Sequence, residues 1–124
     1  MAVRIEIHDR SVQTRKLAIA VWNVPADEKQ ALLRFLEELE LGKVNKGKKI
    51  SESRQSKYLD VLRPPLEFFG KTASEIRTSD VEDFEKALGS GRIQSNRGQA
   101  YSHATKVDIR RALQVYLRWR LGQP

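Results

Sequence analysis

The chain has 124 residues, of which 40% are hydrophobic and 31% are charged, and this size and composition predict one soluble globular domain with a packed core. No apolar stretch approaches the length of about 18 residues that a membrane-spanning helix needs. The absence of cysteine excludes disulfides, thiolate metal ligands and cysteine nucleophiles. No segment has the pattern of a signal peptide, so a cytoplasmic location is expected.

The N-terminal part of the chain is expected to hold a flexible arm and a first helix. Residues 3–7 alternate in the manner of a strand, but the sequence offers no second strand to pair with them, so residues 1–10 are expected to form a loose arm. The stretch from Ser11 to Trp22 places Leu17 and Val21 at helical spacing and is expected to be helical.

A second helix is expected after Pro25. Asp27 and Gln30 have the spacing of a capping box, and Gly42 stands where a C-terminal cap is expected. Between them, four apolar residues recur at i, i+3, i+4 and i+7, namely Leu32, Phe35, Leu36 and Leu39. This pattern predicts an amphipathic helix of about four turns.

The third predicted helix begins at Ser51, a residue type that favours the N-cap. Its apolar side is formed by Tyr58, Leu59, Leu62, Leu66 and Phe69. An interior proline removes a hydrogen bond and clashes with the preceding turn, at a cost of about 3 kcal/mol or more. The pair Pro64-Pro65 therefore predicts a break near Leu62 and a short restarted helix that ends at Phe69.

Two more helices complete the expected fold, which is an all-α bundle of four to five helices. Ser79 and Glu82 have capping-box spacing and open a short helix whose inward residues are Val81, Phe84 and Leu88. Ser102 caps the last and longest helix, which carries an apolar stripe of Ile109, Ala112, Leu113, Tyr116 and Leu117. Residues 11–121 are expected to form one helical domain, and residues 122–124 the start of a linker.

The excess of positive charge is confined to two segments. Residues 42–77 hold nine Lys and Arg against four Asp and Glu, and residues 89–124 hold seven against one, which gives +5 and +6 within a total of +7. The helix between them, residues 78–88, holds one basic residue against four acidic ones. Each basic segment leads into a helix N-terminus, where free backbone N–H groups already attract phosphate.

Basic side chains also line the outer faces of the two helices. Arg54 and Lys57 lie three residues apart on the third helix. On the last helix His103, Lys106 and Arg110 recur at i, i+3 and i+7, beside a polar face of Arg111, Gln114 and Arg118. A groove-binding helix needs such cations for phosphate oxygens and polar groups for base edges. A Lys-rich loop alone would serve solubility, but two segregated basic helices favour a nucleic-acid partner.

The spacing of apolar and capping residues over residues 11–121 resembles the N-terminal core-binding domain of tyrosine recombinases, the phage-integrase or Xer-like family, and most of all its archaeal branch. The matching run is Ser51-x-x-Arg54-x-x-Lys57-Tyr58-x-x-x-Leu62, Leu66-x-x-Phe69, Ile76-x-x-x-Asp80-Val81-x-x-Phe84-x-x-x-Leu88 and Ser102-x-x-Thr105-Lys106-x-Asp108-Ile109-x-x-x-Leu113-x-x-x-Leu117-x-Trp119.

The resemblance implies a SAM-like helical domain that forms one half of a clamp around double-stranded DNA at a recombination site. Self-association on the DNA is a further interaction to test. By pattern, the third and the last helices enter the major groove, and no cofactor or metal is implied. The DNA contacts carried over are Lys48, Lys49, Ser51, Arg54 and Lys57 in a first set and Ser102, His103, Thr105, Lys106, Arg110 and Arg111 in a second.

The same resemblance predicts that this chain is not catalytic by itself. The family's strand cleavage needs a tyrosine nucleophile with arginine, lysine and histidine partners in a separate catalytic domain. Tyr58 and Tyr116 fall in apolar stripes and are expected in the core, and Tyr101 precedes a cap. His8 and His103 have no nearby carboxylate pair at metal-binding spacing. Two alternatives stay open: a helical domain that docks an acidic protein, and a free-standing DNA-binding regulator.

Overall fold

The fold is all-α, as expected from the sequence. The structure, a computed structural model, describes residues 13–44, 47–95 and 97–122. A helix over residues 13–18, here the N-terminal helix, continues into the 3-10 helix η1 (Ile19–Val21). The other elements are α2 (Ala26–Glu40), α3 (Glu52–Phe69), the 3-10 helix η2 (Ala73–Glu75), α4 (Thr78–Gly89) and α5 (His103–Arg120). The expected arm over residues 1–10 and the last two residues of the expected linker lie outside the described residues.

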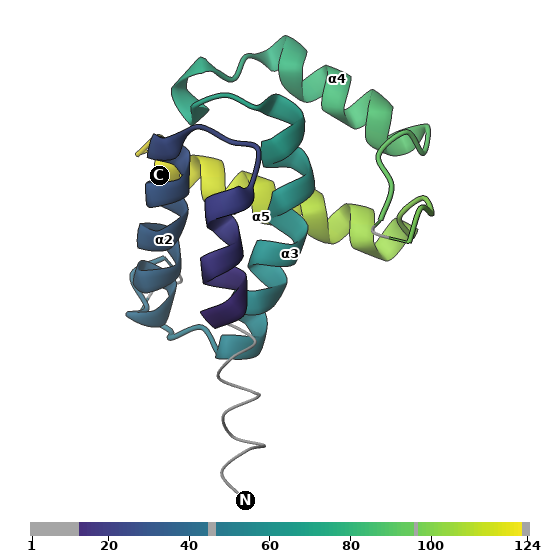
Figure 1. The fold of residues 1–124 in the computed structure, drawn as a ribbon. Coiled ribbons are helices and arrows are strands. Elements are labelled where there is room, and N and C mark those ends of the chain that lie inside the picture. Colours follow the sequence, from purple (N-terminus) through teal and green to yellow (C-terminus); the bar gives the residue numbers. More distant parts are fainter. Residues whose placement is uncertain (1–12, 45–46, 96, 123–124) are drawn as a thin grey trace, which may run out of the picture.

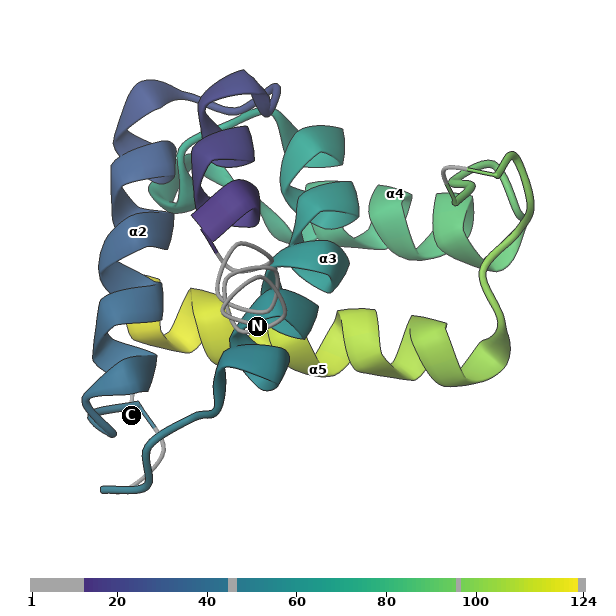
Figure 2. The same ribbon diagram turned by 60° about the horizontal axis from the view of Figure 1, so that its bottom comes forward.

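The helices are arranged around α5, which crosses one side of α2 and α3 (Figure 1). Helix α3 contacts α5 and α4, and α2 contacts α5. The N-terminal helix lies beside α2 and α3, and residues 90–102 connect α4 to α5 at one end of the molecule (Figure 2). Within that connection Gln94 and Ala100 form an isolated antiparallel bridge. The two segments that carry the positive charge are therefore packed against each other through α3 and α5.

The core is centred on the fully buried ring of Phe35 in α2. The rings of Tyr58, Tyr116 and Trp119 meet it at centroid distances of 5.6, 5.2 and 5.2 Å. Such edge-on and tilted contacts between aromatic rings stabilise a core beyond the area that they bury. The prediction that Tyr58 and Tyr116 belong to the core or its edge is confirmed, because Tyr116 is fully buried and Tyr58 packs against the core.

Helix α3 runs without a break through Pro64 and Pro65, so the predicted interruption near Leu62 is wrong. Proline fixes a backbone angle that suits the helix, although each ring removes an N–H donor and crowds the preceding turn. A single continuous helix keeps Leu59, Leu62 and Leu66 on one side, where each is at most 1% exposed. Burial of these side chains on one face is the physical reason that the helix continues, at about 1.5–3 kcal/mol for each fully buried leucine.

Both predicted capping boxes are also wrong, and both helices begin earlier than predicted. Helix α2 follows Pro25, so Asp27 lies inside the first turn and accepts a hydrogen bond from Thr72. Helix α4 follows Arg77, and the carboxylate of Asp80 accepts the Arg77 N–H at 2.9 Å. A carboxylate at the third helical position reaches back to the residue before the helix, which Glu82 is too far along to do.

One carboxylate is buried in the fold and joins three elements. Glu28 of α2 is 1% exposed. Its oxygens accept hydrogen bonds from the backbone N–H of Ala73 in η2 at 2.8 Å, from Nε of Arg120 in α5 at 2.9 Å, and from the hydroxyl of Tyr116 in α5. Burial, together with the hydrogen bond to Glu28, raises the pKa of Tyr116, so this hydroxyl stays protonated and continues to donate. The charge of Glu28 is therefore buried with its partners in place.

Candidate nucleic-acid interface

Two of the predicted DNA contacts, Ser51 and Ser102, cap the helices that carry the basic faces. Ser51 Oγ accepts the Arg54 N–H at 3.3 Å, and Ser102 Oγ accepts the Thr105 N–H at 3.2 Å. Ser102 also donates its hydroxyl to Thr105 Oγ1 at 3.0 Å. Both caps are confirmed, and each satisfies one of the N–H groups that the N-terminus of a helix leaves without a partner inside the helix.

Basic side chains of α3 and α5 meet at a shallow groove of about 330 Å³ between the two helices. Arg54 and Lys57 line it from α3, and Arg111 lines it from α5. We call this site the basic groove, and its other lining residues are Tyr58, Val61, Asp108, Ala112 and Val115. Arg54, Lys57 and Arg111 are exposed, so their charged groups reach solvent while the apolar groove floor is formed by the core.

Three of the predicted DNA contacts form ion pairs within the fold. Lys57 Nζ lies 2.9 Å from Asp108 of α5, Lys49 Nζ lies 3.0 Å from Glu40 of α2, and Arg110 Nε lies 2.8 Å from Glu85 of α4. The hydrogen bond from Lys49, followed by that from Gln55, lowers the pKa of the Glu40 carboxyl. All three pairs are partly exposed and therefore weak, so a phosphate group can compete for these cations at little cost.

The predicted contacts therefore divide into those that line the basic groove and those that lie elsewhere on the molecule. Arg54, Lys57 and Arg111 are brought together at the basic groove. Arg110, which precedes Arg111 in α5, is rotated by about 100° from it and faces α4 instead. His103 and Lys106 share the side of α5 on which Arg110 lies, and Lys48 and Lys49 precede α3 in the loop that follows α2. None of these four lines the groove.

The basic groove offers cations for an anionic ligand. Three long cationic side chains from two helices can contact several phosphate oxygens of one strand or of two. Tyr58 lines the groove and packs against the core, and Tyr101 lies outside the groove. Within residues 13–44, 47–95 and 97–122, no three His, Asp or Glu side chains gather in a way that could hold a metal ion.

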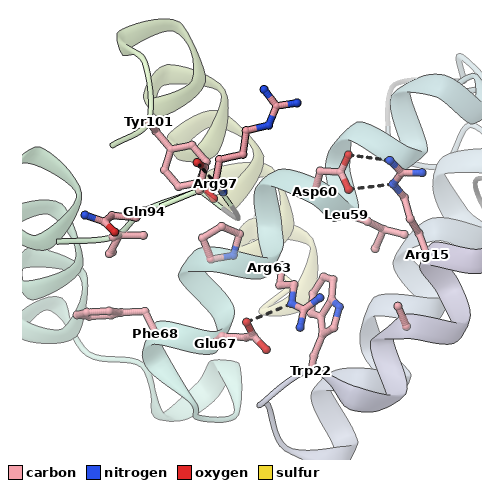
Figure 3. Close-up of a pocket in the computed structure, with 14 residues that line it drawn as sticks. Arg15, Trp22, Leu59, Asp60, Arg63, Glu67, Phe68, Gln94, Arg97 and Tyr101 are labelled. Atoms are coloured by element: carbon pink, nitrogen blue, oxygen red, sulfur yellow. Dashed lines mark hydrogen bonds and ion pairs between the residues drawn. The ribbon is translucent and has the colours of Figure 1, made fainter. Parts of the chain in front are cut away.

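A larger hollow of about 820 Å³ lies on another face of α3 and shares no residue with the basic groove. Its opposite walls are the N-terminal helix and the segment between α4 and α5 (Figure 3). Four of its charged side chains pair internally, Arg15 with Asp60 and Arg63 with Glu67, and the Arg63 guanidinium covers the ring of Trp22 at 5.8 Å. Sequence reasoning did not find this hollow, because its walls come from three distant segments.

Asp108 is not among the predicted contacts, although the sequence contains a clear sign that this residue is unusual. It is the single acidic residue among residues 89–124, which hold seven Lys and Arg, and its carboxylate faces the groove. Tyr58, Val61, Ala112 and Val115 carry no such signal, because apolar residues at helical spacing indicate burial and do not distinguish a groove from a core.

Comparisons with known proteins found no family model, no curated protein and no solved structure that matches this chain. In the part of the chain that the structure describes, no helix combines the length and the apolar character needed to cross a membrane.

Proposed function

We propose that this chain is a non-catalytic module that binds double-stranded DNA through the basic groove, as the core-binding domain of a tyrosine recombinase. The observation that supports the proposal best is the meeting of Arg54, Lys57 and Arg111 on the two helices whose sequence segments carry all of the excess charge. A molecule that used these charges only for solubility would have no need to gather them at one groove.

The chemistry of the groove favours a duplex. The major groove of DNA is about 12 Å wide and accepts a helix, while the phosphates at its borders accept hydrogen bonds from arginine and lysine. The aromatic ring that lines the basic groove, Tyr58, is half-buried and packs edge-on against Phe35, so it is less free to stack on an unpaired base. A single-strand binder stacks bases on aromatic rings, so the groove is better suited to a duplex.

The proposal is tested by the salt dependence of binding to a labelled mixed-sequence duplex. If the three groove cations each contact one phosphate, the affinity should fall about 40-fold between ~50 and ~200 mM salt, since each contact contributes about 0.9 to the slope of log K against log salt. The same strand in single-stranded form should bind more weakly. A lack of duplex binding at ~50 mM salt contradicts the proposal, and selective binding of a poly-glutamate chain instead would favour an acidic protein partner.

Two neighbouring arginines supply a matched pair of variants. Arg111→Ala should reduce the salt slope by about 0.9 and weaken duplex binding several-fold, without a change in melting temperature, because the side chain is exposed and lines the groove. Arg110→Ala removes the same charge but breaks the pair with Glu85, so the slope should change less. Equal losses for both variants would mean that binding depends on net charge and not on the groove.

The assignment to a tyrosine recombinase is tested by the length of the gene's open reading frame. A genomic reading frame that continues past residue 124 into a domain with arginine, histidine and tyrosine at catalytic spacing would support it. A frame that stops there would favour a free-standing DNA-binding regulator.

A further inference from the structure

We propose that Asp108 is a specificity-determining residue of the basic groove and that its carboxylate selects a cytosine base. This inference rests on the proposed function, because it assigns a role within DNA binding. The residue lies on α5, faces the groove beside Arg54, Lys57 and Arg111, and is the only groove-lining residue with a negative charge.

The presence of a carboxylate there has no explanation in the stability of the fold. The side chain is 37% exposed, and its partner Lys57 is 63% exposed. An ion pair of this kind contributes about 0–1 kcal/mol. Asp108 stands in the second turn of α5, beyond the first turn in which a negative charge interacts favourably with the helix dipole. Its neighbour Ile109, and not Asp108, fills the core.

A surface that contacts only the phosphates of DNA is not expected to carry a carboxylate, because the carboxylate and the phosphates are both negative and repel each other. The rest of this part of the chain follows that rule, with seven Lys and Arg among residues 89–124 and Asp108 as the single acid. A carboxylate becomes favourable on a DNA-binding surface when it faces the floor of the major groove, where the N4 amino group of cytosine is a donor. The N6 amino group of adenine is also a donor, but the N7 acceptor beside it repels a carboxylate, as do N7 and O6 of guanine and O4 of thymine.

Lys57 makes this arrangement compatible with the free protein. In the absence of DNA its ammonium group neutralises Asp108 at 2.9 Å. On a duplex the ammonium can move to a phosphate, and because the pair is weak its separation costs little. Asp108 is then left to accept a hydrogen bond from a base. The two side chains thus have separate roles: Lys57 contacts a phosphate of the DNA backbone, and Asp108 recognises a base.

The test is selection of bound sequences from a pool of randomised duplexes by the wild-type chain, Asp108→Asn and Lys57→Gln. The wild type should enrich cytosine at one position, with a preference of about fivefold or more over other bases. Asp108→Asn should move that preference toward adenine, because an amide pairs with N6 and N7 of adenine. Lys57→Gln should bind all sequences more weakly and keep the cytosine preference.

Several results would overturn the inference, and they are distinct from failure of the proposed function. If the wild type binds duplexes but Asp108→Asn leaves every base preference unchanged, Asp108 does not read a base. If Lys57→Gln alters the same position as Asp108→Asn, the carboxylate acts only by placing Lys57. Circular dichroism of each variant excludes loss of folding as the cause, and an unfolded Asp108→Asn is replaced by Asp108→Ser in the same selection. A wild type that binds no duplex removes both proposals together.

Discussion

At the scale of single residues, the buried carboxylate of Glu28 is expected to contribute strongly to stability. Its two oxygens receive a backbone donor from η2 and two side-chain donors from α5. A charge that is removed from water is tolerated only when it has partners, and removal of one partner leaves the other uncompensated.

Glu28→Gln should therefore destabilise the fold strongly. It removes the nearer counter-charge of Arg120, whose side chain is only 21% exposed and whose other acidic partner, Asp27, lies 3.9 Å away, and the expected loss is about 3 kcal/mol in the free energy of unfolding. Tyr116→Phe, the matched variant, removes one neutral donor and should cost less, about 1–2 kcal/mol. Urea denaturation of the two variants measures both values. A neutral Glu28→Gln would show that the network does not stabilise the protein.

At the scale of elements, α3 shows what local sequence rules omit. The proline rule predicts a break because it counts the lost hydrogen bonds and the clash of each ring with the turn before it. It does not count Leu59, Leu62, Leu66 and Phe69, which reach the same core only if the helix continues. The cap of α3 at Ser51 and that of α5 at Ser102 were predictable, because each depends on a contact three residues away.

The cost of the proline pair is measurable. Pro64→Ala should stabilise the protein by about 1–2 kcal/mol, since it restores an N–H donor within the helix and loses only the smaller benefit of a restricted unfolded chain. Pro65→Ala, at a buried position, should gain less because the ring packs in the interior. Thermal unfolding gives the comparison, and a lower melting temperature for Pro64→Ala would contradict it.

The start of α4 predicts a dependence on pH. The hydrogen bond from the Arg77 backbone, followed by that from Lys71, lowers the pKa of Asp80 below its ordinary value of 3.8. The stability that this carboxylate contributes is therefore complete above that ordinary value and is lost as the pH falls through the lower pKa of the folded state. Asp80→Ala should have a lower melting temperature than the wild type at neutral pH. The difference should shrink in acid, and a difference independent of pH would refute the assignment.

At the scale of the whole molecule, the arrangement of the helices decides which charges meet. The sequence placed Arg110 and Arg111 in one set, because both project from the polar side of α5. Only the packing of α5 against α3 and α4 separates them, so that Arg111 faces the basic groove and Arg110 faces Glu85. The helices, the caps and the core residues follow from periodicity, but a groove between two helices depends on their contact, which no spacing within one helix encodes.

The buried carboxylate also leads to a prediction about the order in which the helices associate during folding. Glu28 is separated by 88 residues from Tyr116 and by 92 from Arg120, so its donors come from the far end of the sequence. Contacts between such distant residues form late, because a long loop must close first. Since Glu28 loses water only when those donors arrive, α2 and α5 should dock together after α3 and α4 have associated. Tyr116→Phe should then accelerate unfolding in stopped-flow measurements and leave the rate of folding almost unchanged.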